Sequence, residues 1–212
     1  MRRIAGLSGL TVLALAWGVS APLLPRHPFT AHMASHMAVV AVAAPLLALA
    51  VAGTRVDPVR YGPRVLFSPI PASMVELVAV WGWHAPALHT AARLSPLAYA
   101  GEQASFLLAG LVLWAAVLGG RPVEWRQRRL AGIGALLFTS IHMTLLGALF
   151  TLAPRAFYSH HDGASSHALF DLQLGGTVML VVGGLSYLAG ALGLLRTALE
   201  SDVPWPLRRI ER

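Results

Sequence analysis

The stretch HMASHMAVVAVAAPLLALAVA, residues 32–52, decides the fold class. It contains no acidic residue, lysine or arginine in 21 positions. At a rise of about 1.5 Å per residue, a helix of this length crosses the roughly 30 Å hydrocarbon core of a bilayer. It begins, however, with two histidines four residues apart, each followed by a methionine. The stretch therefore predicts a transmembrane helix with a potential metal-binding group at one end.

The composition of the whole chain agrees with a membrane protein. Of the 212 residues, 56% are hydrophobic and only 12% are charged, whereas a soluble domain averages about 25% charged residues. All sixteen basic residues are arginines that stand between apolar runs rather than in one patch, which argues against a nucleic-acid partner. The chain has no cysteine, which excludes disulfides and thiolate metal sites.

Six apolar stretches reach the length of a membrane span, and short loops with turn-forming residues separate them. The predicted spans cover residues 4–24, 32–52, 70–90, 101–119, 130–153 and 169–195, followed by a tail at 196–212. Backbone polar groups in lipid must be hydrogen-bonded within their own helix. We therefore predict an all-α fold, a polytopic helical bundle in the lipid bilayer that forms a single domain over residues 1–212.

The arginines predict the orientation of this bundle. With the N-terminus inside, thirteen arginines fall in cytoplasmic segments and only three, Arg26, Arg93 and Arg155, fall outside. Because positive residues concentrate on the cytoplasmic side, both termini and the tail should be cytoplasmic, in a bacterial cytoplasmic (inner) membrane. The first span also resembles a secretory signal, with MRR before the apolar run and VSA after it. Pro22 directly follows VSA and should hinder cleavage, so we expect this span to be retained.

The histidines lie on the opposite side. None of the nine falls in a predicted cytoplasmic loop: His27, His32, His36, His84, His89, His142, His160, His161 and His167. His32 and His36 share one face of their helix. His84 falls in the outer half of the third span and His142 near the middle of the fifth. A site built from them should face the outer side of the membrane.

Several of these residues also have an ordinary structural explanation. His32 and His36 suit helix packing at the interface, and His84 suits an aromatic belt with Trp81 and Trp83. One carbonyl would satisfy His142, and solvent would satisfy the histidines of the 154–168 loop. Convergence of several helices on one outer cavity is what favours a metal site. We predict His32, His36, His84, His142, Met33 and Met37 as its ligands.

Three further polar residues are predicted to surround this metal site rather than bind the ion. Glu102 opens the fourth span from the outer side, and Asp171 and Gln173 open the sixth. Charged groups in hydrocarbon normally pair with a partner inside the bundle. We expect Asp171 to accept a ring N–H from a ligating histidine, which would orient that ring.

Imidazole and thioether ligands without thiolate favour copper, and the methionines favour Cu(I). Zinc would use the histidines and a carboxylate but would gain little from the methionines. Haem is an alternative that needs two histidines on facing helices, for which His84 and His142 are candidates. A metal-dependent hydrolase would need a carboxylate base. Glu102 offers one, but the chain has no HExxH spacing.

Five segments together resemble one known family. HPFTAHMASHMAVVAVAAPLLALA, WGWHAPALHTAA, EQASFLLAGLVLW, HMTLLGALFTLAPRAFY and DLQLGGTVMLVVGGLSYLAGAL follow one another in the order found in CtaG-type cytochrome c oxidase assembly factors. The similarity covers roughly residues 25 to 195. His32, His36, His84, His142 and Asp171 fall at the family's motif positions.

The resemblance implies a non-enzymatic membrane protein that delivers or installs copper in a haem-copper oxidase. The expected partners are an oxidase subunit as client and an extracytoplasmic copper donor. The chain departs from the family in two motifs: it reads Glu102-Gln103 where many members read EH, and DLQLGG where they tend to read DQQLGG. It also has one predicted span fewer than the longer members. These departures bear on which residues bind the metal and on which oxidase is the client.

Overall fold

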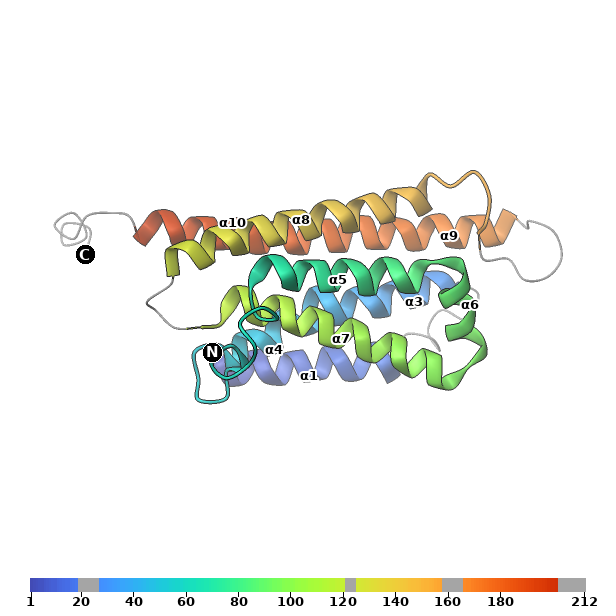
Figure 1. The fold of residues 1–212 in the computed structure, drawn as a ribbon. Coiled ribbons are helices and arrows are strands. Elements are labelled where there is room, and N and C mark those ends of the chain that lie inside the picture. The colour runs from blue at the N-terminus through green and yellow to red at the C-terminus, as the bar shows by residue number, and fades with distance from the viewer. Residues whose placement is uncertain (19–26, 121–124, 158–165, 202–212) are drawn as a thin grey trace.

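The computed structural model describes residues 1–18, 27–120, 125–157 and 166–201, and this part of the chain is helical with no strand. The all-α prediction is therefore confirmed. Most helices run lengthwise beside one another, and α6 lies across one end (Figure 1). The elements are α1 (Arg2–Gly18), α3 (Pro28–Met37), η1 (Ala38–Ala43), α4 (Ala44–Val51), η2 (Pro58–Arg60), α5 (Pro69–His84), α6 (Pro86–Leu94), α7 (Pro96–Leu118), α8 (Trp125–Thr151), α9 (Ser166–Val178), η4 (Met179–Gly183) and α10 (Gly184–Ser201).

Four continuous helices are long and apolar enough to cross a membrane. They are Pro28–Val51, Pro96–Leu118, Gln127–Thr151 and Ser166–Leu199, and they correspond to the second, fourth, fifth and sixth predicted spans. Helices α1 and α5 have only 17 and 16 residues. The membrane character of the chain is thus supported, while six crossings and the side of the termini remain predictions. The cleavage prediction at Pro22 lies outside the described residues.

The third predicted span, residues 70–90, differs from the structure at its outer end. Helix α5 ends at His84, and Ala85 is extended with φ −65° and ψ 136°. The cause is Pro86, because a proline disfavours the helical conformation of the residue before it. Pro86 itself opens the new helix α6, where its missing N–H is not needed. His89 therefore belongs to a separate helix across the bundle end.

Two wide π-helical turns interrupt the long helices. Turn η1 lies between α3 and α4, and η4 lies between α9 and α10. A π-turn disturbs the regular ladder of backbone hydrogen bonds and leaves carbonyls for other donors. Val40 O accepts a bond from Trp114 Nε1 at 3.1 Å, and Ala41 O accepts one from Ser186 Oγ at 2.6 Å. Turn η1 thus connects three helices near the middle of the bundle.

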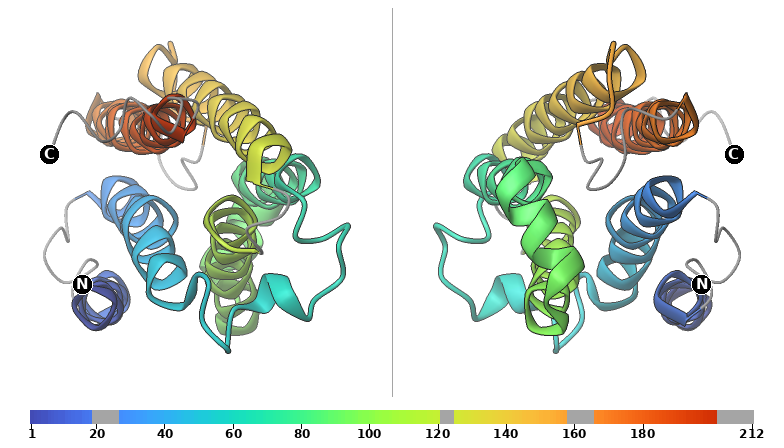
Figure 2. Two further views of the ribbon diagram at one scale, coloured as in Figure 1. Left: turned by 90° about the vertical axis from the view of Figure 1, so that its left-hand side faces the viewer. Right: turned by 90° about the vertical axis from the view of Figure 1, so that its right-hand side faces the viewer.

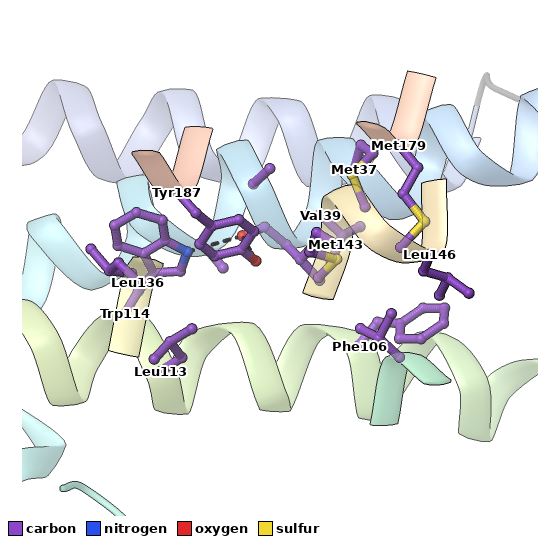
Figure 3. Packing of buried hydrophobic residues seen from close by; sticks show 14 of the residues in the cluster. Met37, Val39, Phe106, Leu113, Trp114, Leu136, Met143, Leu146, Met179 and Tyr187 are labelled. Carbon is purple, nitrogen blue, oxygen red and sulfur yellow. Dashed lines mark hydrogen bonds between the residues drawn. The ribbon is translucent and has the colours of Figure 1, made fainter. Parts of the chain in front are cut away.

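The core combines aromatic and thioether side chains (Figure 3), and the carboxyl group of Glu76 is buried beside them. Trp114 stacks on Tyr187, with ring centroids 5.5 Å apart. The Tyr187 hydroxyl donates to Glu76 Oε1 at 2.5 Å, and both side chains are fully buried. Large aliphatic residues such as Leu108 and Ile141 point outward instead. Polar groups inside and aliphatic groups outside suit a bundle surrounded by lipid.

Glycines bring α8 close to the helix formed by α9, η4 and α10. A Cβ on Gly147 would lie 2.6 Å from Leu180 N, and one on Gly176 would lie 2.6 Å from Thr151 N. Small residues permit such close backbone approach between membrane helices. The start of α9, with Asp171, lies beside the start of α3. The end views show the helices arranged around the bundle axis (Figure 2).

Candidate metal site at one end of the bundle

Four histidine rings gather at the end of the bundle that α6 covers. His32 and His36 come from α3, His84 ends α5, and His89 lies on α6. The ring centroids of His36 and His84 are 5.4 Å apart, and those of His32 and His89 are 5.7 Å apart. The His32 ring also lies 5.9 Å from that of His84 and 6.4 Å from that of His36. We refer to these four residues as the histidine cluster.

His36 is the most deeply buried member of the histidine cluster. Its ring is fully buried and stacks on Phe106 of α7, with centroids 3.9 Å apart and planes inclined by 13°. Neither ring nitrogen has a hydrogen-bond partner among the described residues. Burying a polar group without a partner costs roughly 1–3 kcal/mol. A bound ion would offset that cost.

His84 is fixed in orientation by its own helix. Its Nδ1 lies 2.6 Å from Val80 O, one turn earlier in α5. Because a carbonyl only accepts, Nδ1 carries the proton, and the lone pair is on Nε2. This tautomer leaves Nε2 as the ligand atom of His84. The ring also meets Phe150 of α8 at 5.7 Å.

Two imidazoles and a carboxylate bring their potential ligand atoms close enough together to bind one metal ion. One ligand atom from each of His32, His89 and Glu102 lies within 4.8 Å of the other two. All three residues are buried. His32 Nε2 and Glu102 Oε1 are 3.6 Å apart, too far for a hydrogen bond. Such nitrogen and oxygen donors suit a first-row transition metal ion, including copper.

Arg93 of α6 neutralises the charge of this site. Its Nη2 donates to Glu102 Oε2 at 2.7 Å and lies 3.4 Å from His32 Nδ1. Its guanidinium carbon is 5.3 Å from the centre of the Tyr99 ring. The other oxygen, Glu102 Oε1, is buried without a hydrogen-bond donor among the described residues. The carboxylate thus faces a cation on one side and the imidazoles on the other.

The two predicted methionine ligands lie on a different face of α3. Both are buried, and their neighbours are the glycines of the α9–η4 helix. A Cβ on Gly175 would lie 3.1 Å from Met33 Cγ, and one on Gly183 would lie 3.3 Å from Met37 Sδ. Successive helix residues point about 100° apart. The histidines therefore face α5 to α7 while Met33 and Met37 pack in the core (Figure 3, for Met37).

His142 is buried on α8, and neither of its ring nitrogens has a hydrogen-bond partner among the described residues. The described ring contact of His142 is with Phe138, at 5.4 Å. Phe150, which meets the His84 ring, lies eight residues further along α8. At about 1.5 Å per residue, His142 is roughly 12 Å from Phe150 along the axis of α8. The described ring contacts do not join His142 to a member of the histidine cluster.

Asp171 contacts the backbone at the start of α3, the helix that carries His32, rather than the His32 ring. Its carboxylate accepts the backbone N–H groups of Phe29 and Thr30 at 2.9 and 3.0 Å, and the Thr30 hydroxyl at 2.6 Å. These are N-terminal amides of α3, which a carboxylate caps favourably. The nearest imidazole nitrogen recorded for Asp171 is His27 Nδ1, at 3.6 Å. Asp171 thereby positions the start of α3.

The remaining predicted residues lie away from the histidine cluster. Gln173 donates to Ala153 O at 3.1 Å and joins α9 to the end of α8. His167 stacks on His27 with centroids 5.0 Å apart, near Asp171. His160 and His161 lie outside the described residues.

The sequence analysis missed two residues at the site, His89 and Arg93. His89 was counted among the outer histidines and Arg93 among the outer arginines, and neither was predicted to belong to the metal site. The available signal was Pro86, which predicts a helix start. Counted from Pro86, residues 89, 92 and 93 share one face of a helix. That face carries His89, Ala92 and Arg93 toward the bundle.

One known protein family matches nearly the whole chain. The sequence model of the cytochrome c oxidase caa3 assembly factor family matches residues 1–201. No curated protein and no solved structure matches the chain. The family match covers every helix described above, including all members of the histidine cluster. The chain therefore belongs to the cytochrome c oxidase caa3 assembly factor family.

Proposed function

We propose that this chain binds a copper ion at the histidine cluster and passes it to a subunit of its client haem-copper oxidase. The observation that carries the proposal is the convergence of His32, His89 and Glu102 in a buried site. Beside them lies a fully buried His36 whose ring nitrogens have no hydrogen-bond partner among the described residues. In an oxidase assembly factor, an exchangeable metal site has an evident use: copper is cargo, and no bond in a substrate is broken.

The choice of copper follows from the donors and the family together. Imidazole suits copper, zinc, iron and nickel, and copper binds most tightly in the divalent series. In the sequence analysis, Met33 and Met37 favoured Cu(I) over Cu(II). In the structure they face the helix of α9 and η4 rather than the histidine cluster, so they no longer support that choice. We keep Cu(I) as the proposed oxidation state because a cargo ion must exchange between partners. Titration with both Cu(I) and Cu(II) tests this choice.

The proposed topology has six crossings with both termini in the cytoplasm. Arg2, Arg128 and Arg129 lie at the bundle end where α1 begins and α10 ends, opposite the histidine cluster (Figure 1). We call it the arginine end. The positive-inside tendency assigns it to the cytoplasm. The site then faces the outer side of a bacterial inner membrane, where an extracytoplasmic copper donor and the client would meet it.

Arg93 supplies a way to release the ion. In the metal-free site its guanidinium holds Glu102, the acidic ligand. A metal ion bound to Glu102 competes with this cation for the carboxylate charge. Arg93 therefore lowers the affinity of the site and favours transfer to a partner with better-matched ligands. Since Arg93 lies on the short helix α6, movement of α6 on docking would couple partner binding to release.

The two alternative functions have less support. A haem would need the rings of His84 and His142 on either side of one iron, and the described ring contacts join His84 to Phe150 and His142 to Phe138 instead. A hydrolase would need Glu102 as a general base. Glu102 is instead bonded to Arg93 and adjoins Gln103, whose Nε2 is 3.4 Å away.

The test is a copper titration of the purified protein in detergent. Copper affinity is measured by competition with a chromophoric chelator, for the wild type and for Glu102→Gln and His89→Ala. We expect one tightly bound ion in the wild type and a loss of roughly tenfold or more in each variant. Gln173→Ala, which removes a polar group from another part of the outer end, should bind as the wild type does.

Two results would reject the proposed function. A wild-type protein that binds neither Cu(I) nor Cu(II) rules out copper as cargo. A visible spectrum with the Soret band of a haem would replace copper by the haem alternative. Equal affinity in all the variants would move the site away from the histidine cluster.

A further inference from the structure

Helix α6 turns its polar side to the bundle and its apolar side outward. His89 and Arg93 lie one turn apart, and this side of the helix meets the bundle, where His89 is buried. Ala87, Leu88 and Leu94 are exposed. Ala87 and Leu94 lie roughly 140 to 160° around the helix from His89. A helix on the surface of a soluble bundle has the opposite arrangement, with its polar side toward water. The outward side of α6 therefore fits an apolar neighbour.

The segment that crosses the bundle end carries almost no charge. Residues 85–101 include no acidic residue and one basic residue, Arg93. That charge is paired, because Arg93 donates to Glu102 at 2.7 Å. Leu94 and Leu97 are 80% and 84% exposed, the highest fractions among the leucines that the structure describes. Large apolar side chains grouped on an uncharged surface indicate a site of interaction.

The connections of α6 fix its level relative to the bilayer. One residue, Ser95, separates it from α7, a helix long and apolar enough to cross a membrane. The 23 residues of α7 span roughly 35 Å, slightly more than the hydrocarbon core. The end view places α6 over the ends of α5 and α7, at the rim of the ring of helices (Figure 2). Helix α6 therefore lies beside the boundary between hydrocarbon and headgroups.

The exposed apolar side chains continue from α6 along α7. Leu97, Ala104 and Leu108 are exposed and follow one another at helical spacing. Helix α6 packs against α7, and the guanidinium of Arg93 lies over the half-exposed ring of Tyr99. A tyrosine suits the headgroup level, because its ring is apolar and its hydroxyl is polar. The outward side of α6 thus extends a surface that faces hydrocarbon further along α7.

We propose that α6 is an interfacial helix whose outward side, centred on Ala87 and Leu94, lies in the lipid at this end of the bundle. Interfacial helices bury their apolar side roughly 5–10 Å into the boundary between headgroups and acyl chains. The usual interfacial helix turns its polar side to water, whereas α6 turns it to the histidine cluster. Contact with lipid would then hold α6 in place over the cluster. The inference is independent of copper, because it rests on the pattern and position of α6.

Site-directed spin labelling of the full chain tests this placement. The chain has no cysteine, so each single-cysteine variant carries one nitroxide. The variants Leu88→Cys, Leu94→Cys and Leu97→Cys are made at exposed positions, where a label replaces no core contact. The metal-free proteins are placed in nanodiscs of dioleoyl phosphatidylcholine. Power saturation in electron paramagnetic resonance compares collisions of each nitroxide with oxygen, which concentrates in lipid, and with a neutral nickel chelate, which stays in water.

Two matched positions calibrate the measurement. Val56→Cys is the control for water, since Val56 is apolar and 71% exposed but lies between two charged residues in a loop at the arginine end. Leu108→Cys is the control for hydrocarbon, since Leu108 is exposed well inside α7. We expect the ratio of oxygen to nickel collisions at positions 94 and 97 to be several times the ratio at position 56. The depth should be roughly 5–10 Å.

Two results would overturn the proposal. Ratios at positions 94 and 97 equal to the ratio at position 56 would place the outward side of α6 in water and leave it for a protein partner that the nanodisc lacks. Dipolar broadening between labels at position 94, with neither oxygen nor the nickel chelate in contact, would assign it to a second copy of the chain. A failure of the copper titration would not alter the expected ratios, so the two proposals fail separately.

Discussion

The histidine cluster and the region around Glu76 both bury polar side chains inside the bundle, yet they treat them differently. Near Glu76 most polar atoms have partners: Glu76 Oε1 accepts from Tyr187, and Trp114 and Ser186 donate to the carbonyls of η1, while Glu76 Oε2 has no hydrogen-bond partner among the described residues. At the histidine cluster and the adjoining Glu102, both nitrogens of His36 and one oxygen of Glu102 have no hydrogen-bond partner among the described residues.

The difference separates a structural role from a binding role. Polar groups that satisfy one another fix the arrangement of helices and need no ligand. Polar groups buried without partners destabilise the fold until a ligand arrives. We therefore expect substitutions near Glu76 to change stability, and substitutions in the cluster to change metal affinity.

The largest expected effect concerns the two faces of α3. His32→Ala combined with His36→Ala should lower copper affinity roughly 100-fold or more, because two donors are removed. Met33→Leu combined with Met37→Leu keeps the volume of the core and should leave the affinity within about threefold of the wild type. The measurement is chelator competition on folded protein. Equal losses in the two pairs would restore the methionines as ligands.

The next effect concerns stability. Tyr187→Phe removes the donor to the buried Glu76 and should lower the free energy of unfolding by about 1–3 kcal/mol, with copper binding unchanged. His36→Leu replaces an unpartnered polar ring and should keep or raise the stability of the metal-free protein while weakening copper binding. Thermal unfolding in detergent, without metal, compares the two. A Tyr187→Phe protein as stable as the wild type would remove the contrast between the regions.

A third effect has the opposite sign. Arg93→Gln removes the cation on Glu102 and should raise copper affinity by about tenfold. It should also slow transfer of the ion to a competing chelator, as followed by stopped-flow absorbance. Arg155→Gln removes an arginine at the same end outside the site and serves as the control. A fall in affinity on replacing Arg93 would mean that it supports the site rather than competing with the ion.

The smallest effect is expected at Asp171. Asp171→Asn keeps one acceptor for the start of α3 and should cost about 1 kcal/mol of stability. If Asp171 acts through the helix, copper affinity should change by less than about threefold, whereas an orienting partner of a ligand would change it by about 10–100-fold. Chelator competition on Asp171→Asn, with Gln173→Ala as the control, decides between the two.

Much of the fold could be predicted from the sequence, because apolar length is a local property. The helices matching the predicted spans 32–52, 101–119, 130–153 and 169–195 begin and end within a few residues of expectation, apart from the longer end of α10. The boundary at His84 was also local, and Pro86 signalled it. The predicted span 70–90 extended beyond Pro86 because it was based on apolar content alone.

The candidate site was predictable only in part. The spacing of His32 and His36 places them on one face of a helix, but which neighbour that face meets depends on packing between distant segments. The contacts of Arg93 with His32 and of Asp171 with Thr30 join residues 61 and 141 positions apart. No periodicity in the sequence indicates them. Met33 shows the same limit of sequence-based prediction. Its residue type suggested that it binds copper, but packing between helices places it in the core.

The π-turn η1 also has a consequence for the phase of its helix. A π-turn is equivalent to one extra residue inserted in a regular helix, and one residue corresponds to about 100° of rotation. If the same residues formed a regular α-helix through η1, with none deleted, α3 would be turned against α4 by about that angle. With α4 held by α1 and α7, the histidines would then rotate away from α5 to α7. The π-turn thus sets the rotation of α3 relative to α4 within one continuous helix. This rotation directs the histidines of α3 toward one set of neighbouring helices and the small residues of α4 toward another.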